Sequence, residues 1–277
     1  MTESIKSAPT EADTTEIDRA HAAMVADEAD DLARLRFYER LSESELFMLL
    51  EAEVEGDQIS PAMFEAEDQK FVLIFDREAR MSEFYGKAIA PYAALSGRGM
   101  AQMLEGQRIG MALNMGVAPS AMLVSSEAVD WLAQTLGSDP EEVEGQITQV
   151  SAPTGLPDVL LNALDRKLAT AAGLAAEAYL CGVTYEGGAR GHMLAFVGTI
   201  EGAEVALTAA VNEALVFSGI EAGMLDVAHL AGGDPVSERV AKVGLRFDLP
   251  MPQMPGSSHG QPGANPGMDP TKPPKLH

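Results

Sequence analysis

The sequence predicts an α+β protein with two small α/β sandwich domains, each a mixed sheet packed against helices. Three observations lead to this prediction. The chain has 277 residues, which is more than a typical single domain of roughly 100 to 150 residues. Hydrophobic residues make up 46% of it and charged residues 22%, enough apolar material for two cores. Short apolar runs with strand composition alternate with segments of helical periodicity.

The composition changes at both ends of the chain and once near its middle. Residues 1–14 are polar and without periodicity, so we expect a disordered tail. Residues 250–277 hold 8 of the 16 prolines, and we expect a disordered Pro-rich tail, with a short partner-docking segment as the alternative. A Gly, Ser, Pro and acid-rich linker at 138–155 separates a first domain at 15–137 from a second at 156–249.

Helix caps and apolar runs predict the elements of the first domain. Thr15 and Asp18 form a weak capping-box variant before one helix, and the Asp30–Asp31 pair favours the start of a second. Asp76 is expected to cap a helix after a buried strand. The expected strands cover 45–54, 70–76, 91–96 and 109–116, and the further helices cover 77–85, 97–107 and 125–137.

The second domain begins with Pro157, a favoured residue in the first turn of a helix. A β-hairpin at 179–196 follows, with Gly187 and Gly188 expected as a two-residue turn. After the hairpin we expect helices at 201–219 and 235–244 and strands at 224–231 and 245–249. This order predicts a sheet of about four strands with helices on one face.

Several stretches resemble the SseB family, named for an enhanced serine sensitivity phenotype. "DDLARLRFYERLSESELFMLLEAE", "KFVLIFDREARMSEFYG" and "IGMALNMGVAPSAMLVSSEAVDWL" are similar to its N-terminal domain, with Phe75-Asp76 at the family's strand-to-helix junction. Asn114-Met115-Gly116 stands where the family has an Asn-Pro-Gly-like turn. "AAEAYLCGVTYEGGARGHMLAF" is similar to the SseB C-terminal domain. The resemblance covers residues 17–248 and implies no catalytic residues.

Charge and cysteine content exclude several classes of protein. The formal net charge of −23 repels the phosphate backbone of nucleic acids, so we expect no nucleic-acid partner. No segment reaches the ~18 uninterrupted apolar residues that a membrane-spanning helix needs, and the N-terminal residues lack the pattern of a secretory signal. A single cysteine suits a reducing compartment. We therefore expect a cytoplasmic protein.

No motif predicts catalysis, a cofactor or a metal site. The five histidines are not spaced as metal ligands. Gly97 and Gly99 lack the spacing of a phosphate loop, and we attribute them to a turn with positive φ. Cys181 and His192 lie on one hairpin. In the two-residue-turn register they share a buried face, and in a register shifted by one residue they lie on opposite faces, so neither register makes a nucleophile with its base.

The loop "NMGVAPSAM" is the best candidate for contact with a partner or ligand. Asn114 and Gly116 suit a sharp reversal of the backbone, and methionines are adaptable in apolar contacts. The candidate residues are Asn114, Met115, Gly116 and Met122, with Met111 as a further exposed methionine of this surface.

Two functions follow from these observations. The first is a non-enzymatic regulatory or adaptor protein that acts through protein contacts, linked by the family resemblance to serine sensitivity and to a sulfurtransferase as partner. The alternative is a binding module or weak enzyme that responds to a small molecule such as an amino acid.

Overall fold

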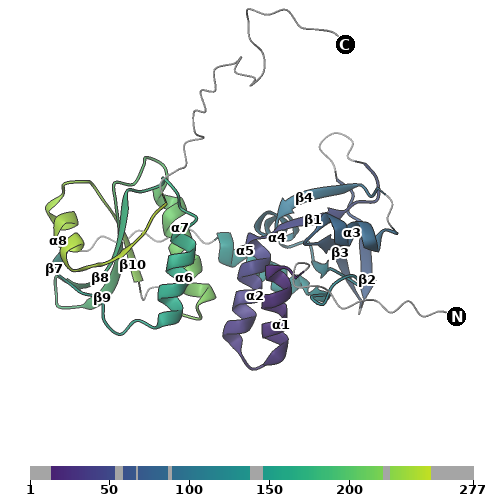
Figure 1. The fold of residues 1–277 in the computed structure, drawn as a ribbon, viewed down its shortest axis with the longest axis horizontal. Helices are drawn as coiled ribbons and strands as arrows, with labels where there is room; N and C mark the ends of the chain where they lie inside the picture. The colour runs from purple at the N-terminus through teal and green to yellow at the C-terminus, as the bar shows by residue number, and fades with distance from the viewer. Residues whose placement is uncertain are drawn as a thin grey trace, which may run out of the picture.

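Two mixed β-sheets, each packed against helices, make up the two halves of the chain (Figure 1). The structure is a computed structural model, and it describes residues 14–53, 59–66, 68–86, 89–137, 146–220 and 225–250. These residues form eight α-helices and eleven strands. The predicted α+β fold class is confirmed. The predicted tails at 1–14 and 250–277 lie almost entirely outside the described residues.

The first half contains five helices and a six-stranded sheet. The strand order is β4-β1-β3-β5-β6, and β2 pairs with β3 beside β1. Strands β3 and β5 are parallel, whereas the other pairs are antiparallel. The elements are α1 (Glu16–Ala26), α2 (Asp31–Glu43), β1 (Glu45–Leu49), β2 (Met63–Ala66), β3 (Gln69–Phe75), α3 (Glu78–Phe84), β4 (Tyr92–Ser96), α4 (Gly97–Leu104), β5 (Ile109–Leu113), β6 (Met122–Val124) and α5 (Ser126–Gly137).

The N-terminal caps act as their residue types predict. Thr15 and Asp18 form a complete capping box at the start of α1. Asp30 accepts hydrogen bonds from the backbone N–H groups of Leu32 and Ala33 and so begins α2. The helices α1, α2, α4 and α5 then bury their apolar stripes on one face of the sheet, around the fully buried Phe37.

The second half contains three helices and a five-stranded sheet. Its strand order is β10-β9-β8-β11, and β7 pairs with β8 beyond the end of β11. Only β9 and β10 run parallel. The elements are β7 (Ile147–Ser151), α6 (Asp158–Leu168), β8 (Glu177–Tyr185), β9 (Arg190–Val197), α7 (Glu204–Phe217), β10 (Leu225–Leu230), α8 (Pro235–Val243) and β11 (Leu245–Phe247).

Helices cover both faces of this second sheet, which corrects the prediction of helices on one face. Leu194 and Phe196 pack with α6 and α7 on the face toward the first half. Tyr179 and Met193 pack with Val240 of α8 on the other face. Both faces are buried, so β8 and β9 are apolar at successive positions instead of alternating.

Other details of the prediction are corrected by tertiary contacts. The short strands β2, β6 and β7 were not predicted, and β7 lies within the segment predicted as a linker. Asp76 does not cap α3, whose N-cap is Arg77 without a side-chain bond. Gly97 and Gly99 are not at positive φ. A Cβ at Gly97 would lie 1.9 Å from the carbonyl oxygen of Leu41, so this glycine permits close packing of α4 on α2.

The two halves share an apolar contact. Phe217, at the end of α7, is 3% exposed and belongs to the core of the first half. Its ring lies edge-on to Trp131 of α5, with 6.3 Å between the centroids. Gly219 approaches Leu32 of α2 so closely that a Cβ would lie 2.8 Å from a side-chain methyl carbon. The last turn of α7 is therefore packed into the helical layer of the first half.

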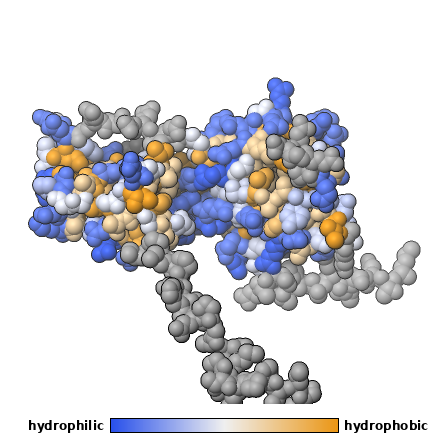
Figure 2. Space-filling model, turned by 90° about the horizontal axis from the view of Figure 1, so that it is seen from above, coloured by the Kyte–Doolittle hydropathy of each residue, from blue (hydrophilic) through white to orange (hydrophobic). Residues whose placement is uncertain are grey.

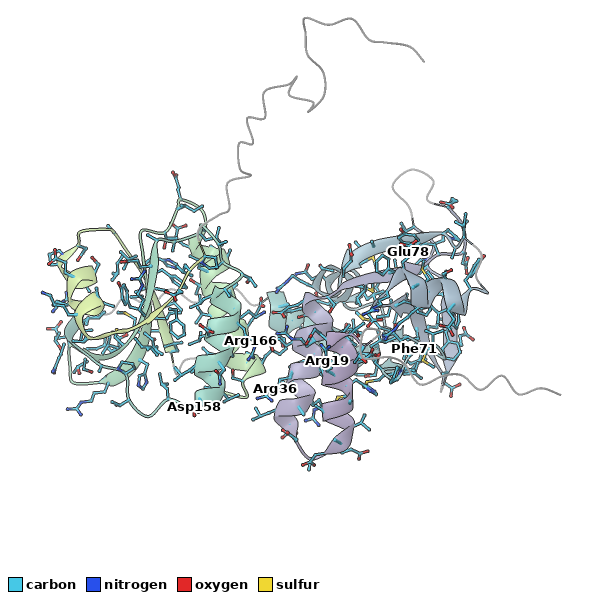
Figure 3. All side chains as sticks on the ribbon, viewed as in Figure 1. Arg19, Arg36, Phe71, Glu78, Asp158 and Arg166 are labelled. Atoms are coloured by element: carbon cyan, nitrogen blue, oxygen red, sulfur yellow. The ribbon has the colours of Figure 1, made fainter. Side chains whose placement is uncertain are left out.

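Ion pairs also connect the two halves. Lys167 of α6 donates to Glu43 of α2 at 2.5 Å and to Glu213 of α7 at 3.0 Å. Arg98 of α4 also donates to Glu213, at 2.8 Å. Burial opposes ionisation of Glu213, but these two cations outweigh it and lower its pKa. Hydrophilic residues accordingly gather between the two halves in Figure 2, and Figure 3 shows Arg166 on the side of α6 toward α2.

Candidate functional site

A path of neighbouring aromatic side chains crosses the face of the first sheet opposite its main helical layer. Tyr92 of β4 lies edge-on to Phe47 of β1, with 5.6 Å between the centroids. Phe47 is the register partner of Phe75 in β3. Phe75 in turn contacts Phe84 of α3 at a centroid distance of 5.3 Å. The path joins three strands to one helix, and Phe71, labelled in Figure 3, is buried in the same apolar cluster.

This face, which we call the α3 face, is incompletely covered. Within the described residues its helix is α3, which has only seven residues, whereas four helices cover the opposite face. Phe84 is 41% exposed, Tyr85 45% and Tyr92 38%. Ile89, just before β4, is 96% exposed, and Phe64 of β2 is partly exposed. Clustered exposed aromatic side chains are typical of a protein-contact surface.

The structure separates the four predicted site residues. Met115 is half-buried and packs into the apolar cluster of the α3 face. Met122 is half-buried on the opposite face, against the main core. Gly116 lies in the turn between them, with φ of 73°. Met111, expected to be exposed, is fully buried. A single methionine surface is therefore not formed, and only Met115 adjoins the α3 face.

Asn114 is fully buried and holds the loop from inside. Its φ of 49° is the left-handed conformation that asparagine tolerates. Its side-chain oxygen accepts from the backbone N–H of Asp76 at 3.1 Å, and its amide nitrogen donates to Ser120 at 2.9 Å. Because β3 and β5 are parallel, Asp76 and Asn114 meet at the same edge of the sheet. Asn114 thus positions the loop and offers no polar group to the surface.

A buried ion-pair network extends from this loop to α1 and α3. Ser120 donates to Asp18 at 2.6 Å, and Arg80 donates to both Asp18 and Asp76. Thr15 donates to Asp76 at 2.6 Å. Burial alone raises the pKa of Asp18, but hydrogen bonds from Arg80, Ser120 and the backbone of Thr15 lower it from 3.8 to about 2. The network ties α1 to the carboxyl ends of β3 and β5.

The hairpin of the second half does not form a catalytic pair. Glu186, Gly187 and Gly188 form a three-residue loop between Tyr185 and Ala189, so the two-residue turn was wrong. In this register Cys181 faces Met193, whereas His192 faces Gly182 on the other side of the sheet. Cys181 is fully buried, and burial raises the pKa of its thiol to about 11.

Other polar pairs in the second half are engaged in local contacts. Tyr185 of β8 donates to Asp226 of β10, across the intervening strand β9. The ring nitrogens of His229 lie 3.0 Å from the Thr199 hydroxyl and 3.1 Å from that of Thr208, and burial lowers the histidine pKa. Across the part of the chain that the structure describes, no three His, Cys, Asp or Glu side chains are grouped as metal ligands.

Comparison with known proteins identifies the first half. Residues 17–131 match the family model of the SseB protein N-terminal domain. The first half of the chain therefore contains an SseB-type N-terminal domain. This SseB-type domain extends from α1 into α5, so it contains the α3 face, the loop after β5 and the buried network. Searches of curated proteins and of solved structures found no match.

Sequence reasoning missed the aromatic path although signals for it were present. Phe47, Phe75 and Tyr92 lie on predicted strands, and strand alternation places Phe71 on the same face as Phe75. What was missing was the strand order, which sets β1 between β4 and β3. Only that order brings Tyr92 and Phe75 to either side of Phe47.

Proposed function

We propose that this protein is a non-enzymatic adaptor or regulatory protein, and that its α3 face binds a protein partner. The observation that carries the proposal is the path of aromatic rings with its exposed ends at Tyr92 and Phe84. Aromatic side chains supply a large share of the binding energy in protein interfaces. The remaining candidate groups support a structural role, since Asn114 and Cys181 are fully buried.

The rim of the α3 face indicates the charge of the partner. Exposed acidic residues lie on the segments that carry this face: Glu51 and Glu53 follow β1, and Glu78 and Glu83 belong to α3. Opposite charge steers association and discourages wrong partners. We therefore expect a partner with an apolar anchor surrounded by Lys and Arg, and a cytoplasmic sulfurtransferase is the first protein to test because of the family resemblance.

Paired surface variants test this proposal. The double variant Phe84→Ser/Tyr85→Ser removes exposed aromatic area from the α3 face and is expected to weaken binding of a purified candidate partner at least tenfold. The matched control is Ile200→Ser/Val205→Ser, which removes exposed apolar side chains next to and within α7. Isothermal titration calorimetry measures the affinity of each double variant for the partner. Equal affinities of the two variants would show that the α3 face is not the binding surface.

A further inference from the structure

A pocket of about 350 Å³ opens between α2 and α5, away from the α3 face. Its lining combines large apolar side chains with one cation and consists of Arg34, Leu35, Tyr38, Ala128 and Trp131. The lining residues come from positions 34–38 of α2 and 128–131 of α5. Apolar pockets with few convergent polar groups are the usual form of a small-molecule site.

Aromatic rings form the apolar wall of the pocket. Tyr38 and Trp131 lie edge-on at a centroid distance of 5.4 Å, with an interplanar angle of 65°. Leu35 and Ala128 complete the apolar lining. Trp131 keeps 36% of its surface exposed, so a ligand that reaches the pocket can contact it. A flat or branched apolar group would gain contact with both rings.

Arg34 provides the polar group at the pocket. Its side chain is 52% exposed, and one of its five N–H donors is used on Asp31 at 2.6 Å. Burial raises the pKa of Tyr38, and the positive charge of Arg34 opposes that rise. The guanidinium is therefore near a side chain that lines the wall. A guanidinium matches the geometry of a carboxylate and can hold it with two parallel hydrogen bonds.

The second half of the chain supports the wall from behind. Phe217 packs edge-on against Trp131, and Gly219 lies close to Leu35, with 3.7 Å between its ideal Cβ position and a side-chain methyl carbon. The positions of Trp131 and Leu35 are thus held by the end of α7 and the turn that follows it, as well as by their own helices. A pocket whose wall is already held in place loses less entropy when it binds a ligand.

We propose that this pocket binds a small amphipathic carboxylate, with its apolar group against Tyr38 and Trp131 and its carboxylate on Arg34. The proposal is independent of the partner surface, because the α3 face and the pocket share no residue. Free serine has no apolar group beyond one methylene, so it lacks the part of the ligand that the rings would hold.

Trp131 is the only tryptophan of the chain, which makes it a direct reporter. We would titrate the full chain with phenylacetate, with its uncharged analogue 2-phenylethanol and with serine, and follow tryptophan emission and the single indole N–H resonance by NMR. Phenylacetate should give saturable changes with at least tenfold higher affinity than 2-phenylethanol. Serine should give no saturable change.

Two arginine variants of α2 distinguish binding at the pocket from a general effect of removing a positive charge. Arg34→Gln should lose at least tenfold in phenylacetate affinity and leave 2-phenylethanol binding within twofold of the unchanged protein. Arg36→Gln is the control, because Arg36 is exposed and does not line the pocket (Figure 3). Equal losses in both variants, or no saturable change of either signal with phenylacetate, would overturn the proposal. Neither result would bear on the α3 face.

Discussion

At the scale of single residues, the buried network around Asp18 accounts for the most unusual side chains of the first half. Asp18 is 4% exposed and Arg80 9%, and each is paired with an oppositely charged side chain. Removing one partner from a buried ion pair leaves an uncompensated charge, which costs more than the pair contributes. Asp18 also accepts from Ser120, so the same carboxylate holds the loop that Asn114 begins.

The substitution Asp18→Asn should lower the free energy of unfolding by about 3 kcal/mol, because Arg80 loses a buried carboxylate partner. Urea denaturation followed by circular dichroism measures the free energy of unfolding. Glu16→Gln is the control, since Glu16 and Arg19 form an exposed pair worth less than about 1 kcal/mol. A loss for Asp18→Asn no larger than that of the control would contradict the structural role of the network.

Asp18 should also make stability depend on pH. Its pKa is about 2 in the folded state and 3.8 without these interactions, so its carboxylate favours the folded state above about pH 4. That contribution of about 2 kcal/mol should be lost as the pH falls from about 4 to about 2. Denaturation between pH 2 and 6 should therefore show a shallower decline for Asp18→Asn than for the unchanged protein.

At the scale of elements, close backbone approach decides where α4 can lie. Gly97 begins α4, and its N–H donates to the carbonyl of Ser44 just beyond α2. The space beside it is filled by the backbone of Leu41. A backbone obstacle cannot rotate away as a side chain can, so any Cβ at this position requires the two helices to separate.

Gly97→Ala is expected to destabilise the protein by about 2 kcal/mol, because the added methyl group collides with Leu41. Gly137→Ala is the matched control at the end of α5, where nothing lies within 4 Å and φ is not positive. It should be neutral or stabilise by about 0.5 kcal/mol, since alanine restricts the unfolded chain. Thermal denaturation compares the melting temperatures of the two variants. Equal shifts in melting temperature would contradict the close approach of α4 and α2.

At the scale of the whole molecule, the two halves are joined by apolar contacts at the end of α7 and by ion pairs of α6 and α7 with the first half. Phe217 belongs in sequence to the second half but is buried in the core of the first. The link also includes the buried pair of Lys167 with Glu213 and the contact of Lys167 with Glu43. The buried side chain of Phe217 supplies the apolar part of the link between the halves, so its removal should weaken their coupling.

Phe217→Ala should uncouple the halves. We expect one cooperative thermal transition in the unchanged protein and two in the variant, with an increased radius of gyration by small-angle scattering. Val205→Ala, on an exposed position of the same helix, should leave the single transition in place. A single transition in Phe217→Ala at an unchanged radius of gyration would argue against this contact as the main link between the halves.

At each of these scales, the sequence by itself determined the features that depend on residues close together in the chain. The capping box at Thr15, the cap at Asp30, the apolar stripes and the left-handed Asn114 follow from local chemistry, and the structure confirms each of them. Strand composition likewise predicted β1, β3, β4, β5 and the hairpin. The similarity of the first-half stretches to the SseB N-terminal domain is confirmed by the family match over residues 17–131, whereas the similarity of the hairpin to the SseB C-terminal domain stays a prediction.

Tertiary structure decided everything that depends on which elements become neighbours. The hairpin register could not be derived, because sequence alone does not distinguish a two-residue loop from the observed three-residue loop, and a shift of one position moves each side chain to the other face. Asp76 looked like a cap but pairs with Arg80, and Gly97 looked like a turn but permits a helix contact. The aromatic path and the Trp131 pocket exist only because strand order and helix packing bring distant segments together, and no local pattern in the chain encodes those distances.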